Sequence, residues 1–161
     1  MLRLRNVRLE GTARDELRRL QRRINSLGGY SEKVAEAKSE FARHNRISNP
    51  AFREVRAALT TMCSNSRRCA YCEDSVADEV EHIKPKDLYP DLAFVWKNYL
   101  YACGPCNGPK NNQFAVFSRR TGNQVEVSRK RGQPIVPPEP GAPVLIDPRV
   151  ENLAAAIDSC V

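Results

Sequence analysis

Two Cys-x-x-Cys pairs constrain the fold of this chain more than any other feature of its sequence. The first pair is Cys69 and Cys72, and the second is Cys103 and Cys106. Four thiolates complete a closed tetrahedral zinc site, in which no position is left for water. Binding of such a structural ion contributes roughly 10–16 kcal/mol in small modules, which is comparable to the stability of a domain. The spacing therefore predicts a zinc-centred fold, whereas the alternative, a redox dithiol, needs only one pair.

Composition narrows the class of protein. The chain has 161 residues, of which 41% are hydrophobic, and its mean hydropathy is −0.55. These values predict a soluble, globular protein with one domain, or one domain with added helices. We find no apolar run long enough to span a bilayer, and residues 1–10 alternate Leu with Arg instead of forming a signal peptide. Six cysteines in this context predict a cytoplasmic metal-binding protein without a membrane partner.

The net charge of +7 is confined to the N-terminal part of the chain. Residues 1–60 contain 14 Lys and Arg against 7 Asp and Glu, whereas residues 61–161 contain 12 of each. Such a surplus suits an electrostatic contact with a polyphosphate backbone. The alternatives are a solvated helical surface and a face for an acidic partner protein, and the sequence does not decide between them.

Periodicity predicts a short strand over residues 2–9, followed by three amphipathic helices. Thr12 is the candidate N-cap of the first helix, and the second helix starts at Ser31. The third helix has Asn49 as its cap and Pro50 as its first helical residue. We expect His44 to lie at the boundary of the second helical stripe. The apolar stripes are Leu17, Leu20, Ile24 and Leu27; Val34, Ala37 and Phe41; and Phe52, Val55, Leu59 and Met62.

The region between the cysteine pairs predicts two strands followed by a helix. The strands cover residues 80–83 and 96–102, and the helix begins near Asn107 and continues through Lys110. Beyond it, residues 124–128 resemble a hairpin strand, residues 134–143 are proline-rich and extended, and a short helix starts near residue 152.

With these elements in this order, the sequence resembles a known family, the zinc-knuckle HNH endonucleases. The matching residues are Cys69-x-x-Cys72, Glu81-His82-Ile83-Lys84-Pro85, Trp96-x-Asn98 and Cys103-x-x-Cys106-Asn107-x-x-Lys110. More narrowly, residues 71–73, 81–86, 89–90 and 102–107 resemble the HNH component of Septu-type and retron-associated antiphage systems. The resemblance implies an α+β fold with a ββα-metal nuclease module at 64–118, after a basic helical segment at 1–63. An irregular extension at 119–161 follows the module.

The resemblance also implies roles for individual residues. His82 would be the general base, Glu81 and Asn107 would hold a catalytic Mg²⁺ or Mn²⁺, and Asn98 would orient the loop of His82. Phosphate contacts are expected from basic residues near the site, namely Arg67, Arg68, Lys84, Lys86 and Lys110. Gly108-Pro109 departs from what a metal-binding helix needs, because both residues are poor helix formers.

These features predict a metal-dependent endonuclease that hydrolyses DNA, with RNA as the other polymer such a site cleaves. The resemblance implies an antiphage complex in which the nuclease is paired with an ATP-binding-cassette-like ATPase. A homodimer of the chain is a further expected assembly. Because the family pattern continues past a segment like residues 145–148, we expect the helical element that docks on the ATPase, or on another nuclease subunit, to be missing or remodelled in this chain. The alternative hypothesis is a non-catalytic zinc module that binds nucleic acid or scaffolds a partner.

Overall fold

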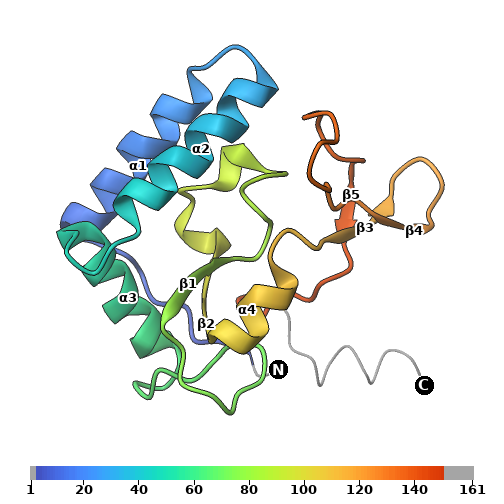
Figure 1. Cartoon of the computed structure of the whole chain (residues 1–161). Helices are drawn as coiled ribbons and strands as arrows, with labels where there is room; N and C mark the ends of the chain where they lie inside the picture. Colours follow the sequence, from blue (N-terminus) through green and yellow to red (C-terminus); the bar gives the residue numbers. More distant parts are fainter. Residues whose placement is uncertain (1–2, 151–161) are drawn as a thin grey trace, which may run out of the picture.

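The computed structural model describes residues 3–150, and their fold is α+β, as predicted (Figure 1). The helices are α1 (Gly11–Asn25), α2 (Tyr30–His44), α3 (Pro50–Met62) and α4 (Gly104–Lys110). The strands are β1 (Glu79–His82), β2 (Tyr99–Ala102), β3 (Ala115–Ser118), β4 (Gln124–Glu126) and β5 (Gly141–Pro143). Two 3₁₀ turns, Pro90–Leu92 and Trp96–Asn98, lie between β1 and β2.

The three N-terminal helices form where the apolar stripes predicted them. Asn49 caps α3, because its side chain accepts a hydrogen bond from the Phe52 amide at 3.2 Å. The prediction of Thr12 as the cap of α1 is wrong. Instead α1 begins at Gly11, and the Glu54 carboxylate of α3 accepts a hydrogen bond from the Ala13 amide at 3.1 Å. A neighbouring helix thus supplies the cap that the local sequence does not.

The predicted strand at residues 2–9 does not form in the described part, residues 3–9. That segment is irregular, and its Leu4 amide donates a single backbone hydrogen bond to Pro148 at 2.7 Å. A strand needs a continuous ladder of such bonds with a neighbour. No partner strand lies beside this segment within residues 3–150, so the alternation of Leu and Arg alone does not produce one.

The two strands predicted between the cysteine pairs form, and they pair as a hairpin. β1 and β2 pair antiparallel with Glu79 opposite Ala102 and His82 opposite Tyr99. The second strand is shorter than expected, because Trp96–Asn98 is a 3₁₀ turn. Helix α4 starts at Gly104, three residues before the predicted start, since Pro105 in its first turn needs no amide partner.

The C-terminal part of the described chain forms a second sheet with the order β4-β3-β5. β4 falls within the predicted strand at 124–128, and the proline-rich segment is extended until it pairs with β3 as the edge strand β5. The helix predicted from residue 152 lies outside the described residues. Within residues 3–150, no helix has both the length and the apolar character needed to cross a bilayer.

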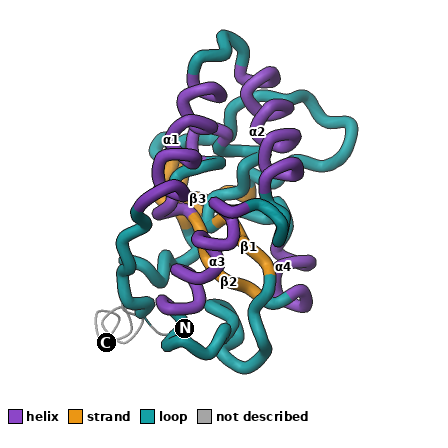
Figure 2. Tube along the Cα trace, turned by 90° about the vertical axis from the view of Figure 1, so that its left-hand side faces the viewer, coloured by secondary structure: helices purple, strands orange, loops and turns teal. Residues whose placement is uncertain are grey.

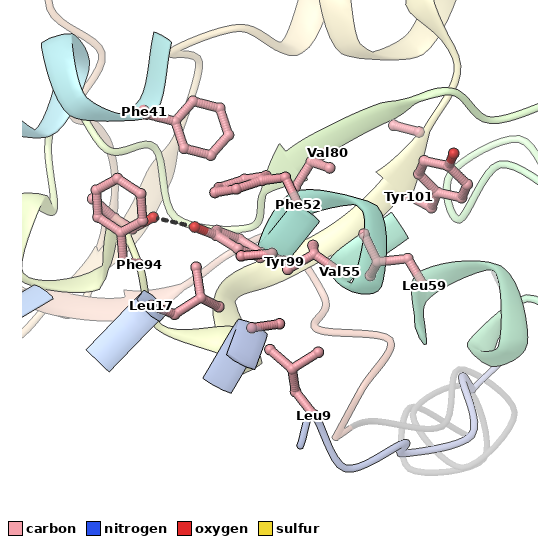
Figure 3. Close-up of a cluster of buried hydrophobic side chains, with 14 of the residues drawn as sticks. Leu9, Leu17, Phe41, Phe52, Val55, Leu59, Val80, Phe94, Tyr99 and Tyr101 are labelled. Carbon is pink, nitrogen blue, oxygen red and sulfur yellow. Dashed lines mark hydrogen bonds between the residues drawn. The ribbon is translucent and has the colours of Figure 1, made fainter. Parts of the chain in front are cut away.

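One hydrophobic core joins the N-terminal helices to the hairpin. Leu17, Phe41 and Phe52 of the three helices belong to the same buried cluster as Phe94 and Tyr99 (Figure 3). Figures 1 and 2 show the hairpin between α3 and α4, and α3 packs on β2 while α4 packs on β1. The core therefore crosses the expected boundary at residue 63, and the division into three parts stays a prediction.

Candidate metal centre and active site

The four paired cysteines are positioned to bind a metal ion such as zinc. Their Sγ atoms all lie within 4.8 Å of one another, and the Sγ atoms of Cys72 and Cys103 are 3.9 Å apart. Tetrahedral zinc with Zn–S bonds of about 2.3 Å needs sulfur pairs separated by about 3.8 Å. The Cys69 sulfur also accepts hydrogen bonds from the amides of Tyr71 (3.4 Å) and Cys103 (3.3 Å). The site thus fits the predicted ion.

The protonation of these thiols depends on that ion. Burial, followed by the neighbouring thiols, raises the pKa of Cys106 to about 12. The backbone amides of Ser75 and Asp74 lower the pKa of Cys72 to about 6. Because a thiolate is the ligand, metal binding has to release protons from the cluster. Cys63 is buried outside the cluster, and burial raises its pKa to about 11, so it remains an ordinary thiol. Cys160 lies outside the described residues.

A polar cavity of about 550 Å³ opens where β1, α4 and the helices α2 and α3 meet. His82, Glu81 and Asn107 all line it, so three of the residues expected at the active site surround one space. Lys86 lines the same cavity from the loop after β1. The hairpin and α4 place these side chains, and the cysteine cluster joins the start of α4 to the turn before β1.

The His82 ring is buried, and its environment determines which nitrogen carries the proton. Its Nε2 atom lies 2.9 Å from the carbonyl oxygen of Ala93. A carbonyl can only accept, so Nε2 donates and Nδ1 keeps its lone pair. The same oxygen accepts a hydrogen bond of 2.7 Å from the Tyr99 hydroxyl (Figure 3). The rings of Phe41 and Tyr99 pack on the imidazole with centroids 4.4 Å and 5.1 Å away.

Burial, together with the charges of Lys86 and Lys110, lowers the pKa of His82 to about 3. The imidazole is therefore neutral at physiological pH, as a general base must be before it acts. The same shift makes it a weak proton acceptor in the absence of a neighbouring anion. A phosphate in the cavity would counteract the two lysines and raise this pKa.

The acidic side of the site is formed by β1 and α4. Lys110 pairs with the Glu81 carboxylate and also donates to the carbonyl of His82 at 2.8 Å. Burial raises the pKa of Glu81, and Lys110 opposes this shift. Asn107 donates to Glu79 at 2.5 Å. Glu79 was missed by the sequence analysis, although its spacing of two residues from Glu81 on a strand was a signal for a shared face.

Carboxylate and amide oxygens around one cavity are the donor set that hard cations such as Mg²⁺ and Mn²⁺ take. In this donor set, however, Glu81 already has a cationic partner, the Lys110 ammonium group. A divalent ion bound by Glu81 and Asn107 would have to share the carboxylate with that lysine, or displace it. The residues present therefore fit one divalent cation, provided that Lys110 shares the Glu81 carboxylate with the ion or moves away from it.

Asn98 is buried and connects the two ends of the loop that follows His82. Its Oδ1 accepts from the Lys84 amide at 2.8 Å, and its Nδ2 donates to the carbonyls of Lys84 (3.0 Å) and Leu92 (3.1 Å). This geometry keeps Asn98 away from a substrate in the cavity. The orienting role expected for Asn98 stays a prediction.

The expected phosphate-binding residues do not all reach the cavity. Lys86 lines it, whereas Lys84 lies over the Tyr89 ring at 5.4 Å. The Arg67 Nε donates to the Ala77 carbonyl at 3.2 Å, and Arg68 lines a separate cavity near the N-terminal segment.

A basic residue that the sequence analysis missed, Arg56, lines the cavity from α3. It donates to Asn45 at 2.5 Å, and burial lowers its pKa. Arg56 belongs to a helix outside the motif, so the sequence carried no signal for its place in this cavity.

Gln21 is a third residue that sequence reasoning missed. This buried side chain of α1 accepts a hydrogen bond from the Phe94 amide at 2.8 Å and donates to the Pro90 carbonyl at 3.1 Å. It thereby fixes the segment that carries the Ala93 carbonyl, the partner of His82. No local pattern distinguishes Gln21 from a surface glutamine, since its partners lie 69 and 73 residues away.

Comparison with known proteins gives a partial match. The chain is 44% identical over 61 residues to the Septu protein PtuB of Bacillus thuringiensis, a stretch that covers 35% of this chain and 23% of that protein. The matched region thus spans about a quarter of the relative. No protein-family profile and no solved structure matches the chain. The chain is therefore a partial homologue of a Septu protein, with a cysteine cluster suited to a metal ion.

Proposed function

We propose that this chain is a metal-dependent endonuclease of the HNH type, which hydrolyses phosphodiester bonds of DNA. The observation that carries the proposal is the surroundings of His82. A neutral imidazole, whose Nε2 proton is directed to the Ala93 carbonyl, lines one cavity together with Glu81 and Asn107. A hairpin and a short helix carry these three residues beside a cysteine metal site, the arrangement that the ββα-metal resemblance implies.

In this proposal His82 acts through its unprotonated nitrogen. Nδ1 accepts a proton from a water molecule, while Nε2 stays bonded to Ala93 and keeps the ring in one orientation. The rings of Phe41 and Tyr99 prevent the imidazole from turning away. General-base catalysis by a positioned side chain typically contributes about 10²–10⁴-fold in rate.

Glu81 and Asn107 are the residues that would hold the catalytic Mg²⁺ or Mn²⁺. Bound there, the ion would supply positive charge to the phosphate in the transition state. Lys86 and Arg56 line the same cavity and add positive charge toward the phosphate without a metal. Asn98 holds the loop that follows His82 through its bonds to Lys84 and Leu92, and the cysteine cluster with zinc supports the hairpin and α4.

The segment shared with the Septu protein PtuB supports a role in an antiphage defence complex. Proteins that the HNH motif resembles are paired with an ATP-binding-cassette-like ATPase, so we propose such an ATPase as the partner. The nuclease would be the effector subunit, and the ATPase would control when it acts.

The test is a plasmid-nicking assay with Mg²⁺ or Mn²⁺, performed alone and with an ATPase encoded beside the chain. The His82→Gln variant should keep its metal and fold but lose about 10²–10⁴-fold in rate. His44→Gln is the matched control, because His44 is half-buried on α2 and lies outside the cavity. Equal nicking by wild type and His82→Gln would exclude His82 as the base.

A second candidate function is a non-catalytic metal module that binds nucleic acid or scaffolds a partner. Two features favour it. The ion pair with Lys110 occupies the Glu81 carboxylate that would bind the metal ion, and the low pKa of His82 makes the imidazole a weak base. Under this hypothesis wild type leaves plasmid intact with either metal, with or without the ATPase, while the cysteine site retains its ion.

A further inference from the structure

A groove that the proposed reaction does not use lies along one side of α1. It has a volume of about 970 Å³ and is bounded by α1, by residues 6–9 and by residues 94–97. None of its lining residues lines the cavity that contains His82. The groove is therefore a separate surface feature, and its chemistry has to be explained separately.

Positive charge dominates the rim of this groove. Arg14, Arg18 and Arg22 are spaced four residues apart and follow one side of α1, and Lys97 lies on the facing segment. The acid among the lining residues is Asp15, which is bonded to Arg14 at 2.9 Å. Within residues 3–150, Arg18, Arg22 and Lys97 form no ion pair. These charges are available to an external anionic group.

The floor of the groove is apolar. Leu9 and Leu17 are buried beneath it, and Val7, Val95 and Trp96 are half-buried along it. A ligand that fills this space must therefore offer both apolar groups and negative charge. Carboxylates meet guanidinium groups in paired hydrogen bonds, while an aliphatic side chain gains free energy by covering an apolar floor.

A single-stranded nucleic acid meets the charge requirement but lacks a place for its bases. Bases bind such grooves by stacking on open aromatic faces. The Trp96 ring already has the Arg149 guanidinium over it at 4.6 Å and the Tyr99 ring against it at 90°. Its indole N–H donates to the Val7 carbonyl at 2.9 Å. The aromatic surface in the groove is thus committed to internal contacts.

From this combination we infer that the groove binds an acidic, amphipathic segment of a partner protein. Its carboxylates pair with Arg18, Arg22 and Lys97, and its apolar side chains cover the floor beside Trp96. This inference stands independently of the nuclease proposal, because it uses none of the residues around His82. The inference also assigns part of the excess positive charge of residues 1–60 to a specific contact surface.

Trp96 is the sole tryptophan of the chain and lines the groove, so its fluorescence reports occupancy. The probe is a synthetic helical peptide of about 15 residues with Glu on one face and Leu on the other. It is titrated into the metal-loaded full chain, beside the same peptide with Lys for Glu and an oligothymidylate of similar length. We expect saturable emission changes with the Glu peptide alone.

The variant Arg18→Glu/Arg22→Glu should bind the Glu peptide at least about tenfold more weakly and should now bind the Lys peptide. The matched control is Arg46→Glu/Arg53→Glu, which makes the same change in net charge at exposed positions outside the groove. This control should bind like wild type. Unchanged metal content and far-ultraviolet circular dichroism show that both variants fold.

Several results would overturn the inference. Oligothymidylate binding that the groove variant loses and the control keeps would assign the groove to nucleic acid. Equal loss of peptide binding in both variants would reduce the effect to overall charge. No emission change with any probe would exclude an acidic ligand. A dimer of the chain alone that the groove variant abolishes would make a second copy the occupant.

Discussion

At the scale of single residues, the Ala93 carbonyl organises the candidate site. It accepts one hydrogen bond from His82 and one from the Tyr99 hydroxyl, and both donors are buried. Two donors satisfy both lone pairs of the oxygen, so the two hydrogen bonds hold the carbonyl in its orientation. The orientation of His82 thus depends on a backbone atom, which any amino acid at position 93 would provide.

The buried neutral His82 predicts a specific loss of stability in acid. An unfolded histidine takes up a proton below its ordinary pKa of about 6.5, whereas folded His82 resists protonation down to about 3. Protonation therefore favours unfolding, and the stability contribution present above pH 6.5 is lost progressively as the pH falls towards 3. At pH 5.5 the wild type should lose on the order of 1 kcal/mol relative to pH 7.5.

Urea unfolding at the two pH values, with the cysteine site kept loaded, measures this loss. His82→Gln should lack this part of the pH dependence while sharing all other acid effects, because it removes the titrating ring alone. If both proteins lose the same free energy, the imidazole is not held in a neutral state by its surroundings.

At the scale of secondary-structure elements, α1 does more than cover the core. Gln21 extends from its buried face to the backbone of the segment that carries Ala93. Helix α2 contributes Phe41, which packs on His82, and α3 contributes Arg56 to the cavity. The N-terminal helices therefore build part of the candidate site, although none of them belongs to the recognisable motif.

Replacing Gln21 with Met should destabilise the protein by about 1–3 kcal/mol, because the buried Phe94 amide loses its acceptor. Nicking should also fall, since the Ala93 carbonyl is less well fixed. Denaturant unfolding and the plasmid assay measure the two effects. Arg19→Met on the exposed face of α1 is the control, and losing its ion pair with Glu16 should cost less than about 1 kcal/mol. Similar losses in both variants would contradict the role of Gln21.

At the scale of the whole molecule, the metal site and the helices stabilise one core together. The cysteines Cys69 and Cys103 are part of the same cluster as residues of α1, α2 and α3. Deleting residues 1–60 would therefore expose the hairpin and would not test partner binding by itself. Substitutions on the surface of the intact chain, such as those in the α1 groove, avoid this problem.

Replacing Cys103 with Ser should remove the metal and most of the stability together. Because structural zinc contributes several kcal/mol at least, the melting temperature should fall by more than about 10 °C. Metal analysis and thermal unfolding by circular dichroism provide the measurements. Cys63→Ser, at a buried thiol outside the cluster, should keep its metal and change the melting temperature much less. A metal-free Cys103→Ser protein with wild-type stability would show that the ion is dispensable.

Much of the fold follows from local pattern. The stripe ending in Phe41 and the one beginning at Phe52 predicted their helices because period 3.6 places such residues on one face. The pairing of β1 with β2 and the cysteine cluster also match the predictions. The strand predicted at residues 2–9 does not form in its described part, residues 3–9, because alternation cannot supply a partner strand. The predicted cap of α1, Thr12, is wrong because Glu54 of α3 accepts the hydrogen bond of the Ala13 amide instead.

In the candidate site, too, some features were predicted and others were not. The family resemblance named His82, Glu81 and Asn107 for one site, and all three line the same cavity. The pairing of Glu81 with Lys110, the contact of Asn107 with Glu79 and the presence of Arg56 were not predictable. Each depends on how α4 and α3 lie against β1, and that arrangement is decided by packing between distant segments.

The sequence by itself determined the four-cysteine cluster that could hold a metal ion, the amphipathic helices and the two strands between the cysteine pairs. These features depend on short spacings, which the backbone geometry of a turn, helix or strand converts directly into positions. The tertiary structure alone decided the protonation of His82, the role of Gln21 and the basic groove on α1. Those properties depend on burial and on partners far away in the chain, and only the folded packing brings such groups together.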